Sequence, residues 1–495
     1  MFAKSLVKSS AWNLIGQGAP ILFALITVPL LLKTIGEARY GFLTVVWVLI
    51  GYLGLFDFGV GKAMTRVVAE RLGQGDRVGA GVVAKAALMM MLGIGLLSAT
   101  GFLVFAEFIV GRLALPAALH QEGVNAMRIL ALGLPFVMLT SGYRGCLEAC
   151  NQFGPLNIVR VGMGLFTYLA PLAAVLWSPR LEFLVAAVVA MRVVANVVHR
   201  LLYQRYCSFE LATGVPDQWR VELRKLLGFG GWMTVSNIIS PMMNSLDRLI
   251  IGTIVPVAAV GYYATAYDMI SKVLMLPYSI TGAAFPAIAG MADDGQVRRV
   301  YTGMFKFMAI LVLPVLAGAA LLADVGFHAW LGQRFAQEAA PALKILAIGL
   351  LFNCVAQVPA TLILTRGSPR WMALCHVVEA PCYLGLVMFL TTKWGIQGTA
   401  LAWAIRAAVD AMLLAYLAQR KLVRGALTPS LLIIIMVLAV MMFAPAFATG
   451  PLMWRLLGFL AALAASGVIV WRHLLTEVER PQLLAALQRR KEGWT

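Results

Sequence analysis

The sequence predicts an all-α integral membrane protein with about 14 transmembrane helices, because its apolar residues gather in bands long enough to cross a bilayer. Hydrophobic residues make up 61% of the 495 residues and charged residues only 13%. A soluble domain carries roughly 25% charged residues, so this chain has too little charge to cover a soluble core. A shift of the sequence by about 220 residues also brings the first two bands onto the seventh and eighth, which is typical of membrane proteins built from repeated halves.

The predicted transmembrane segments follow one another with short loops. They lie at 12–32, 42–61, 82–106, 126–147, 155–177, 181–203, 227–252, 257–280, 303–323, 342–365, 371–392, 396–419, 430–448 and 453–475. The first apolar run exceeds the roughly 7–15 residues of a signal-peptide core, so we expect an uncleaved first helix. We expect kinks at Pro20, Pro29, Pro241, Pro277 and Pro314.

The repeat organises these segments into two lobes. Gly41 falls on Gly261, and Arg128–Phe136 (RILALGLPF) resembles Lys344–Phe352 (KILAIGLLF). Six spans separate the first band from the seventh, so both enter the membrane from the same side and the repeat is parallel. The predicted parts are an N-terminal lobe (1–203), a cytoplasmic linker (204–226), a C-terminal lobe (227–419), an appended helix pair (430–475) and a cytoplasmic tail (476–495).

The basic residues predict the orientation. With the N-terminus inside, about 23 Lys and Arg residues fall on inner segments and about six on outer ones, as the positive-inside rule describes. Both termini are therefore predicted to be cytoplasmic. The formal net charge of +18 follows from this bias, and no basic stretch interleaved with aromatic residues indicates nucleic acid.

The sequence contains no pattern that indicates a cofactor or a metal. The six cysteines include no C-x-x-C pair, so neither zinc nor a disulfide framework is expected. The glycine-rich run Gly51–Lys62 lacks P-loop spacing, and Ala63 stands where Ser or Thr should follow the Lys.

Several ionisable residues fall inside predicted spans, where a charge costs roughly 2.5–3.5 kcal/mol on insertion scales. They are Asp57, Arg144, Glu148, Arg160, Arg192, Asp247, Arg248, Asp268, Lys272, Glu379, Arg406 and Asp410. Arg144/Glu148, Asp268/Lys272 and Arg406/Asp410 are spaced four apart, so each can form an ion pair on one helix face. In the repeat, most candidate charges fall opposite apolar residues, whereas Arg160 falls opposite His376.

Two stretches resemble a known family. Tyr40–Glu70 (YGFLTVVWVLIGYLGLFDFGVGKAMTRVVAE) is similar to the second-helix region of polysaccharide-unit flippases, where a Leu-x-Asp-Phe-Gly run precedes a basic loop. Asn244–Ile270 (NSLDRLIIGTIVPVAAVGYYATAYDMI) resembles the seventh-to-eighth helix region of the same family. The chain is identified as a member of the O-antigen/exopolysaccharide flippases of the multidrug/oligosaccharidyl-lipid/polysaccharide exporter superfamily.

This resemblance implies two pseudo-symmetric six-helix lobes around a central cavity, plus a C-terminal helix pair. It implies a transporter, not an enzyme, in the bacterial inner membrane. The cargo would be an undecaprenyl-pyrophosphate-linked oligosaccharide, moved from the cytoplasmic to the periplasmic leaflet by alternating access. Related carriers use H⁺ or Na⁺ gradients, and the expected partners are membrane lipids and polysaccharide polymerase or export machinery.

Position and side-chain chemistry give the candidate site residues. Arginine binds phosphate oxygens in pairs, so Arg66, Arg144, Arg160 and Arg248, followed by Lys272 and Arg406, are candidates for the anionic head. Candidates for the sugar are Tyr263, Tyr267, Asn237 and Asn244. Candidates for ion coupling are Asp57, Asp247 and Asp268.

Other functions remain open at this point. A lipid II flippase shares the mechanism, and a multidrug or cation antiporter of the same superfamily shares the fold but would favour acidic cavity residues. A membrane polysaccharide polymerase or ligase would need a long periplasmic loop, which the sequence lacks. A non-transporting subunit of an export complex would not move lipid by itself.

Overall fold

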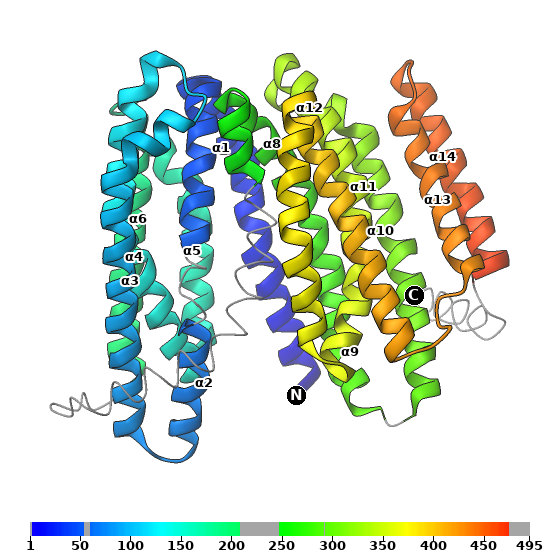
Figure 1. Cartoon of the computed structure of the whole chain (residues 1–495), viewed down its shortest axis with the longest axis horizontal. Coiled ribbons are helices and arrows are strands. Elements are labelled where there is room, and N and C mark those ends of the chain that lie inside the picture. Colours follow the sequence, from blue (N-terminus) through cyan, green and yellow to red (C-terminus); the bar gives the residue numbers. More distant parts are fainter. Residues whose placement is uncertain (1, 54–59, 208–246, 292, 475–495) are drawn as a thin grey trace. The chain divides into compact units, whose positions relative to one another are not determined.

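The computed structural model describes residues 2–53, 60–207, 247–291 and 293–474, in which every regular element is helical. Within these ranges the chain forms two compact units, Met1–Tyr262 and Tyr263–Thr495. In each unit the long helices run side by side (Figure 1). Because 208–246 lies outside the described residues, the predicted linker and the boundary between the lobes stay predictions.

Unit 1 contains the first six long elements and the start of a further one. They are α1 (Phe2–Leu53), α2 (Val60–Gly73), α3 (Arg77–Arg112), α4 (His120–Ala149), α5 (Phe153–Ala174), α6 (Leu181–Tyr206) and the first residues of α8 (Val257–Ile270), with a short 3₁₀ turn, η1 (Ala117–Leu119), before α4. α1 holds the predicted spans 12–32 and 42–61 up to Leu53, with non-helical angles at Gly36 (φ 78°) between them. A positive φ is accessible to glycine at little cost, so this residue separates the two spans.

The helices of unit 1 pack in an order that places α4 at the centre. α4 contacts both α3 and α6, while α5 packs against α1 and α6. A buried cluster that includes Met64, Ala84, Met91 and Met138 joins α2, α3 and α4. The outer face of α3 is apolar and exposed, for example at Leu97 and Val104, as expected for a surface that faces lipid.

Two glycines that the repeat aligns lie against each other. A Cβ added to Gly41 of α1 would collide with the carbonyl oxygen of Val257, and a Cβ added to Gly261 of α8 would lie 2.8 Å from Cδ1 of Tyr40 and 3.4 Å from Cα of Gly41. Small residues at such positions let helix backbones approach closely. Backbone bonds from Ala114 N to Gly252 O (2.8 Å) and from Val257 N to Ala114 O (3.0 Å) attach the same segment to the α3–α4 connection.

Unit 2 begins with a helix that is interrupted. The predicted span 257–280 is divided between α8, a 3₁₀ turn η2 (Ser271–Leu274) and α9 (Met275–Gly290), so the helix is interrupted near Pro277, where a kink is predicted. The cause is Pro277, which has no N–H to donate to the carbonyl four residues earlier and whose ring crowds that turn. The chain tightens into a 3₁₀ turn just before it.

The remaining helices of unit 2 are α10 (Asp294–Leu331), α11 (Gln333–Arg366), α12 (Pro369–Lys421), α13 (Pro429–Phe447) and α14 (Leu452–Ile469), which ends in a π-helical turn, η3 (Val470–Leu474). α12 contains two antiparallel halves, because Trp394 and Gly395 (φ 55°) leave the helical region. Thr391 Oγ1 and Thr399 Oγ1 lie 2.7 Å apart across this turn. A Cβ on Gly398 would collide with the Leu390 carbonyl.

The appended pair α13 and α14 is attached to unit 2 by packing against α10 and by an ionic link. Asp324 of α10 accepts hydrogen bonds from Lys344 Nζ of α11 (2.7 Å) and from Arg455 Nη2 of α14 (3.2 Å). Arg455 also donates to the carbonyl oxygens of Leu321 and Ala446. This guanidinium therefore joins three helices.

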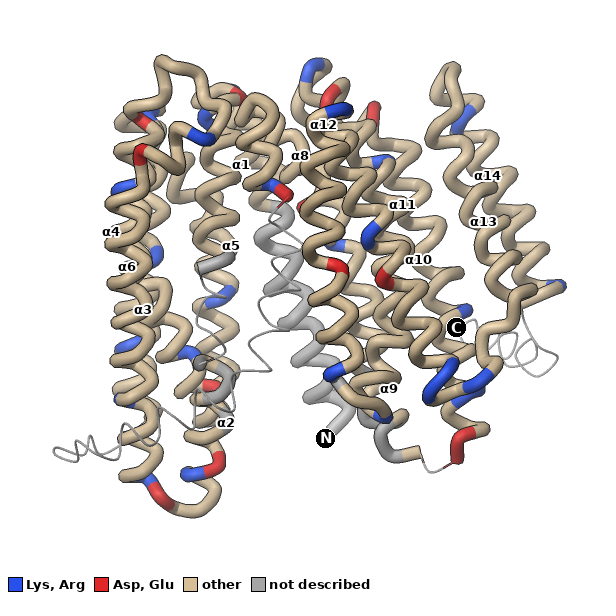
Figure 2. The backbone as a smooth tube through the Cα atoms, viewed as in Figure 1, with Lys and Arg blue, Asp and Glu red and all other residues tan. Residues whose placement is uncertain are grey.

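Among the described residues, nine helices are long and apolar enough to cross a membrane, and α1 and α12 each contain two of the predicted segments. Most charged positions lie toward the ends of the helices and few lie along their middles (Figure 2). The all-helical membrane fold predicted from the sequence is thereby confirmed. The few charges in the middle of the helices are where a functional site is expected.

Candidate functional site

Three arginines and a histidine line one pocket in unit 1. The pocket has a volume of about 380 Å³ and its polar lining residues are Thr140, Ser141, Arg144, Arg160, Arg192 and His199. This volume falls in the range of roughly 300–1,000 Å³ of small-molecule sites. Its apolar wall comes from Ile50, Val137, Leu156 and Met163.

Helical periodicity brings these residues together from three helices. On α6, Arg192, Asn196 and His199 are spaced four and three apart, so they lie on one face. On α4, Thr140 and Arg144 are one turn apart, and α5 contributes Arg160. Because α6 packs between α4 and α5, the polar faces of the three helices meet in the pocket.

The hydrogen bonds around the pocket hold its polar side chains in place. Asn196 Nδ2 donates to the Phe136 carbonyl oxygen (3.2 Å) and to Thr140 Oγ1 (3.3 Å). His199 Nδ1 lies 2.7 Å from the Ala195 carbonyl oxygen. A carbonyl only accepts, so Nδ1 carries the hydrogen and Nε2 is left for a proton or a ligand.

The pocket carries an excess of positive charge. Arg144 Nε lies 3.7 Å from Glu148 Oε1, so the expected ion pair is formed, but the Arg144 side chain is still 50% exposed. In the described part of the chain, neither Arg160 nor Arg192 forms an ion pair with a carboxylate. Guanidinium groups bind phosphate oxygens with two parallel hydrogen bonds, so this pocket is chemically suited to a phosphate-bearing anion.

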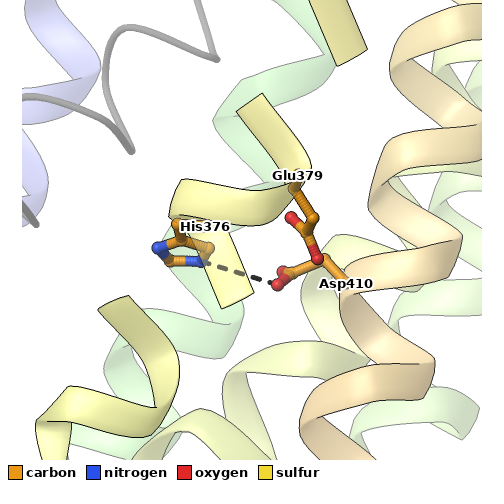
Figure 3. Close-up of side chains that lie close together, drawn as sticks. All are labelled: His376, Glu379 and Asp410. Carbon is orange, nitrogen blue, oxygen red and sulfur yellow. Dashed lines mark ion pairs between the residues drawn. The ribbon is translucent and has the colours of Figure 1, made fainter. Parts of the chain in front are cut away.

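A second polar cluster lies in unit 2 between the two halves of α12. His376, Glu379 and Tyr383 of the first half are spaced three and four apart, and so are Trp403, Arg406 and Asp410 of the second half. His376 Nε2 lies 3.5 Å from Asp410 Oδ1, and the close-up shows Glu379 beside them (Figure 3). The expected Arg406/Asp410 pair is not formed. Instead, the Arg406 guanidinium lies 5.4 Å from the Tyr383 ring and 5.9 Å from the Trp403 ring.

The structure brings some of the predicted site residues together. Arg144 and Arg160 share the pocket of unit 1. Tyr263 is fully buried and stacks on Tyr267 at a centroid distance of 6.4 Å, and Tyr267 packs edge-on against Trp403 at 5.4 Å. Tyr267 is therefore adjacent to the aromatic ring beneath Arg406.

Other predicted residues are placed elsewhere. Asp247 and Arg248 are buried, with Arg248 N donating to Asp247 Oδ1 (2.8 Å), and neither lines the pocket of unit 1. Asp268 and Lys272 do not form the expected pair, because the 3₁₀ turn η2 changes the helical register between them. Asp57, Asn237, Asn244 and the side chain of Arg66 lie outside the described residues.

Five ionisable residues of these two clusters were not among the candidate site residues of the sequence analysis. They are Arg192, His199, His376, Glu379 and Asp410, of which Arg192, Glu379 and Asp410 stood only among the charges inside predicted spans. Their signal was the spacing of polar residues along one face, 192/196/199 and 376/379/383, inside otherwise apolar bands. In the repeat, Arg160 of the first cluster aligns with His376 of the second.

Comparison with known proteins identifies relatives. Residues 34–340 match the family described as "Polysaccharide biosynthesis protein". The chain is 30% identical over 417 residues to a putative O-antigen transporter of Shigella flexneri, which covers 84% of this chain and 98% of that protein.

Two solved structures share the fold. The lipid II flippase MurJ in an inward closed conformation aligns with a TM-score of 0.68 at 13% identity, over 93% of this chain and 99% of that one. An inward-facing multidrug resistance MATE transporter of the MOP superfamily aligns with a TM-score of 0.67 at 15% identity, over 83% and 98%. The match over more than half of its length shows that this chain belongs to the polysaccharide biosynthesis protein family.

Proposed function

We propose that the chain is a flippase that moves lipid-linked oligosaccharide units across the bacterial inner membrane for the synthesis of a surface or exported polysaccharide. The cargo carries a pyrophosphate between a polyprenyl tail, such as undecaprenyl, and the sugars. It moves from the cytoplasmic to the periplasmic leaflet by alternating access. Both termini of the chain face the cytoplasm, in keeping with the bias of basic residues.

The cationic pocket of unit 1 is the observation that carries this proposal. A pyrophosphate cannot enter hydrocarbon unless its charge is compensated. Arg144, Arg160 and Arg192 supply three guanidinium groups within one pocket, and the Nε2 atom of His199 adds a further donor when it is protonated. Such a set favours an anion with two adjacent phosphates over a neutral or cationic ligand.

The surrounding residues fit an amphipathic cargo. The pocket has an apolar wall of Ile50, Val137, Leu156 and Met163, and the outer faces of the helices are apolar. The polyprenyl tail can therefore stay in lipid while the head is held by arginine. The rings of Tyr263 and Tyr267, with Asn237 and Asn244, remain proposed contacts for the sugars.

An ion gradient supplies the driving force in this proposal, because moving a charged head between leaflets against its gradient needs an energy source. H⁺ and Na⁺ are the candidate coupling ions, and Asp57, Asp247 and Asp268 remain candidate sites. Polysaccharide polymerase and export proteins are the proposed partners on the pathway.

A lipid II flippase is the second candidate, because lipid II presents the same polyprenyl pyrophosphate to the same arginines. The likeness in fold to MurJ is compatible with both readings. A multidrug exporter of organic cations is disfavoured, since three arginines in the pocket would repel such a substrate.

The function can be tested by reconstituting the full chain in liposomes with a labelled lipid-linked oligosaccharide. A glycolipid that has no prenyl pyrophosphate serves as the control cargo. We expect transfer of the first lipid and not of the second. Arg160→Ala and Arg192→Ala should abolish transfer, while Arg200→Ala, an exposed arginine on α6 outside the pocket, should retain it. Equal transfer by all four proteins would contradict the proposal.

Growth complementation separates the two candidate cargoes. A strain that lacks an O-antigen flippase should regain surface polysaccharide when it expresses this chain, whereas a strain depleted of its lipid II flippase should not survive on it. Rescue of the second strain alone would assign the chain to cell-wall synthesis.

A further inference from the structure

The cluster in α12 contains three titratable side chains that the anion pocket does not use. One ligand-type atom from each of His376, Glu379 and Asp410 lies within 4.8 Å of the others. His376 and Glu379 come from the first half of α12 and Asp410 from the facing half, and the three side chains point toward one another (Figure 3). The hairpin turn at Trp394–Gly395 is what makes the two halves neighbours.

All three side chains are buried. Their exposed fractions are 9% for His376 and 7% for both Glu379 and Asp410. Within the described residues, the two carboxylate oxygens of Glu379 and the Oδ1 atom of Asp410 have no hydrogen-bond partner. Buried carboxylates are normally satisfied by donors, so this cluster lacks the donors that two ionised carboxylates would need.

Among the residues that the structure describes, few titratable groups lie near the cluster. On α12 itself they are Cys375, Tyr383 and Arg406, and the charge of Arg406 acts on Glu379. α11, which packs against α12, carries Cys354 as the titratable side chain of its span between Lys344 and Arg366. α8 brings Asp268, which follows the Tyr267 ring that packs on Trp403.

Charge balance indicates what the cluster binds. With both carboxylates ionised, Arg406 protonated and His376 neutral, these four groups carry one net negative charge. In a membrane-embedded helix pair an uncompensated charge is strongly disfavoured, and two adjacent carboxylates resist simultaneous ionisation. One added proton, shared by the two carboxylates and His376, makes the group neutral and supplies the missing O–H donor.

A metal ion fits the same site less well. Hard cations such as Ca²⁺ take six or more oxygen ligands, and this cluster offers two carboxylates and one imidazole. The permanently charged Arg406 beside Glu379 already supplies one positive charge and would repel a divalent ion. A proton needs only one oxygen and one acceptor, both of which are present.

The repeat connects this cluster with the anion pocket. Arg160 and His376 occupy equivalent positions in the two halves, and each lies in the fifth predicted span of its own half. The two halves carry different ionisable side chains in this region, arginines in the first half and His376 with two carboxylates in the second.

We propose that His376, Glu379 and Asp410 form a proton-binding site that takes one proton from water on one side of the membrane and releases it to water on the other. No covalent bond to carbon forms or breaks, since the proton moves onto a carboxylate oxygen and later leaves it. The use of this proton to drive cargo movement rests on the flippase function proposed above. The existence of the proton site does not depend on that function.

Infrared difference spectroscopy of the full chain in nanodiscs tests the proton site directly. In Na⁺-free, chelator-treated buffer, a change of pH should produce a protonated-carboxyl C=O band in the wild type. The band should be lost in Glu379→Gln and in Asp410→Asn. It should be kept in Glu338→Gln, which replaces an exposed residue near the start of α11. The neutral amides keep the shape of each side chain, and the melting temperature of each variant checks its fold.

Any of three results would overturn the proton site. One is a wild-type spectrum without the band at any pH at which the protein is folded, and this result needs no variant. Another is a band that survives both substitutions. A spectrum that responds to added Na⁺ or Zn²⁺ and not to pH would also contradict it, because the ligand would then be a metal ion.

A vesicle assay tests the coupling separately. If one proton is exchanged per lipid, a pH difference of one unit should shift the leaflet ratio of labelled lipid about tenfold in the wild type. Glu379→Gln and Asp410→Asn should equilibrate the lipid without responding to the gradient. Transfer that responds to pH equally in these variants refutes the coupling, whereas an absence of transfer by every protein refutes the flippase function and leaves the infrared result standing.

Discussion

Replacement of Arg160 by alanine tests the anion pocket most directly. The residue reaches the pocket from α5, and no carboxylate in the described part of the chain forms an ion pair with it. Its guanidinium is therefore available to a ligand. Hydrogen bonds to charged groups contribute about 1.5–3 kcal/mol, and every 1.4 kcal/mol is a factor of ten in Kd. Arg160→Ala should then weaken binding of a pyrophosphate lipid roughly 10- to 150-fold.

Arg144 should contribute less than Arg160. Its side chain is 50% exposed and lies 3.7 Å from Glu148, so part of its charge is already neutralised. An exposed ion pair of this kind is worth about 0.2–1 kcal/mol. Glu148→Gln should accordingly strengthen pyrophosphate binding by up to about fivefold, since it releases Arg144 for the ligand. Arg160→Ala and Glu148→Gln thus change the affinity for pyrophosphate in opposite directions.

Binding of a short-chain prenyl pyrophosphate to the full protein in nanodiscs measures these effects, with the prenyl alcohol as the uncharged probe. Arg160→Lys keeps the charge but not the planar fork, so its Kd should fall between those of the wild type and Arg160→Ala. Arg200→Ala controls for a general loss of positive charge. The pocket assignment is refuted if Arg160→Ala binds as tightly as the wild type, or if Arg200→Ala weakens binding equally.

Four further predictions concern the framework around the sites. Asp324→Asn removes the negative charge shared by two cationic side chains and replaces one of its two acceptor oxygens by an NH₂ donor, so it should lower the free energy of unfolding by about 1–3 kcal/mol, seen as a lower melting temperature in detergent. Gly41→Ala should prevent folding because its Cβ meets the Val257 carbonyl, whereas Gly101→Ala, which meets nothing, should express normally. Cys150 and Cys207, whose Sγ atoms lie 2.9 Å apart, should form an intramolecular disulfide with copper phenanthroline, and mass spectrometry of alkylated peptides should find none in Cys207→Ser. The Gly79 N–H and the Arg71 guanidinium lower the pKa of Asp76. The ionised Asp76 carboxylate therefore stabilises α3 fully above the ordinary Asp pKa of about 3.9, and this stabilisation is lost as the pH falls through the lowered pKa. Faster amide exchange in the first turn of α3 would reveal the loss.

The helical membrane fold follows from the sequence because lipid leaves the backbone few choices. A band of apolar residues must satisfy its own hydrogen bonds, and a helix does so. The break before Pro277 was foreseen as a kink but not as a division of the span, because the missing donor could be absorbed by bending or by a 3₁₀ turn. The packing of the neighbouring helices decides between these outcomes, and it cannot be predicted from the sequence of one segment.

The site was predictable only in part for a related reason. Arg144 and Arg160 stood out because a charge in a span is costly, and the structure places them in one pocket. Spacing within one helix correctly indicated the Arg144/Glu148 pair, but it also indicated Arg406/Asp410, where contacts from the other half of α12 prevail. Pairs within a helix can be read from a sequence, whereas pairs between helices depend on which faces meet.

The contact between Gly41 and Gly261 has a consequence for the history of the chain. The two residues are equivalent in the repeat, and the Val257 backbone fills the space beside Gly41 while the Tyr40 ring and the Gly41 Cα fill the space beside Gly261. A larger residue in either copy cannot be compensated by a change in the other, since both are already the smallest residue. Duplication normally frees one copy to diverge, but here it bound the two copies to each other. The two halves differ instead at positions such as Arg160 and His376, where a change of side chain does not require two backbones to move apart.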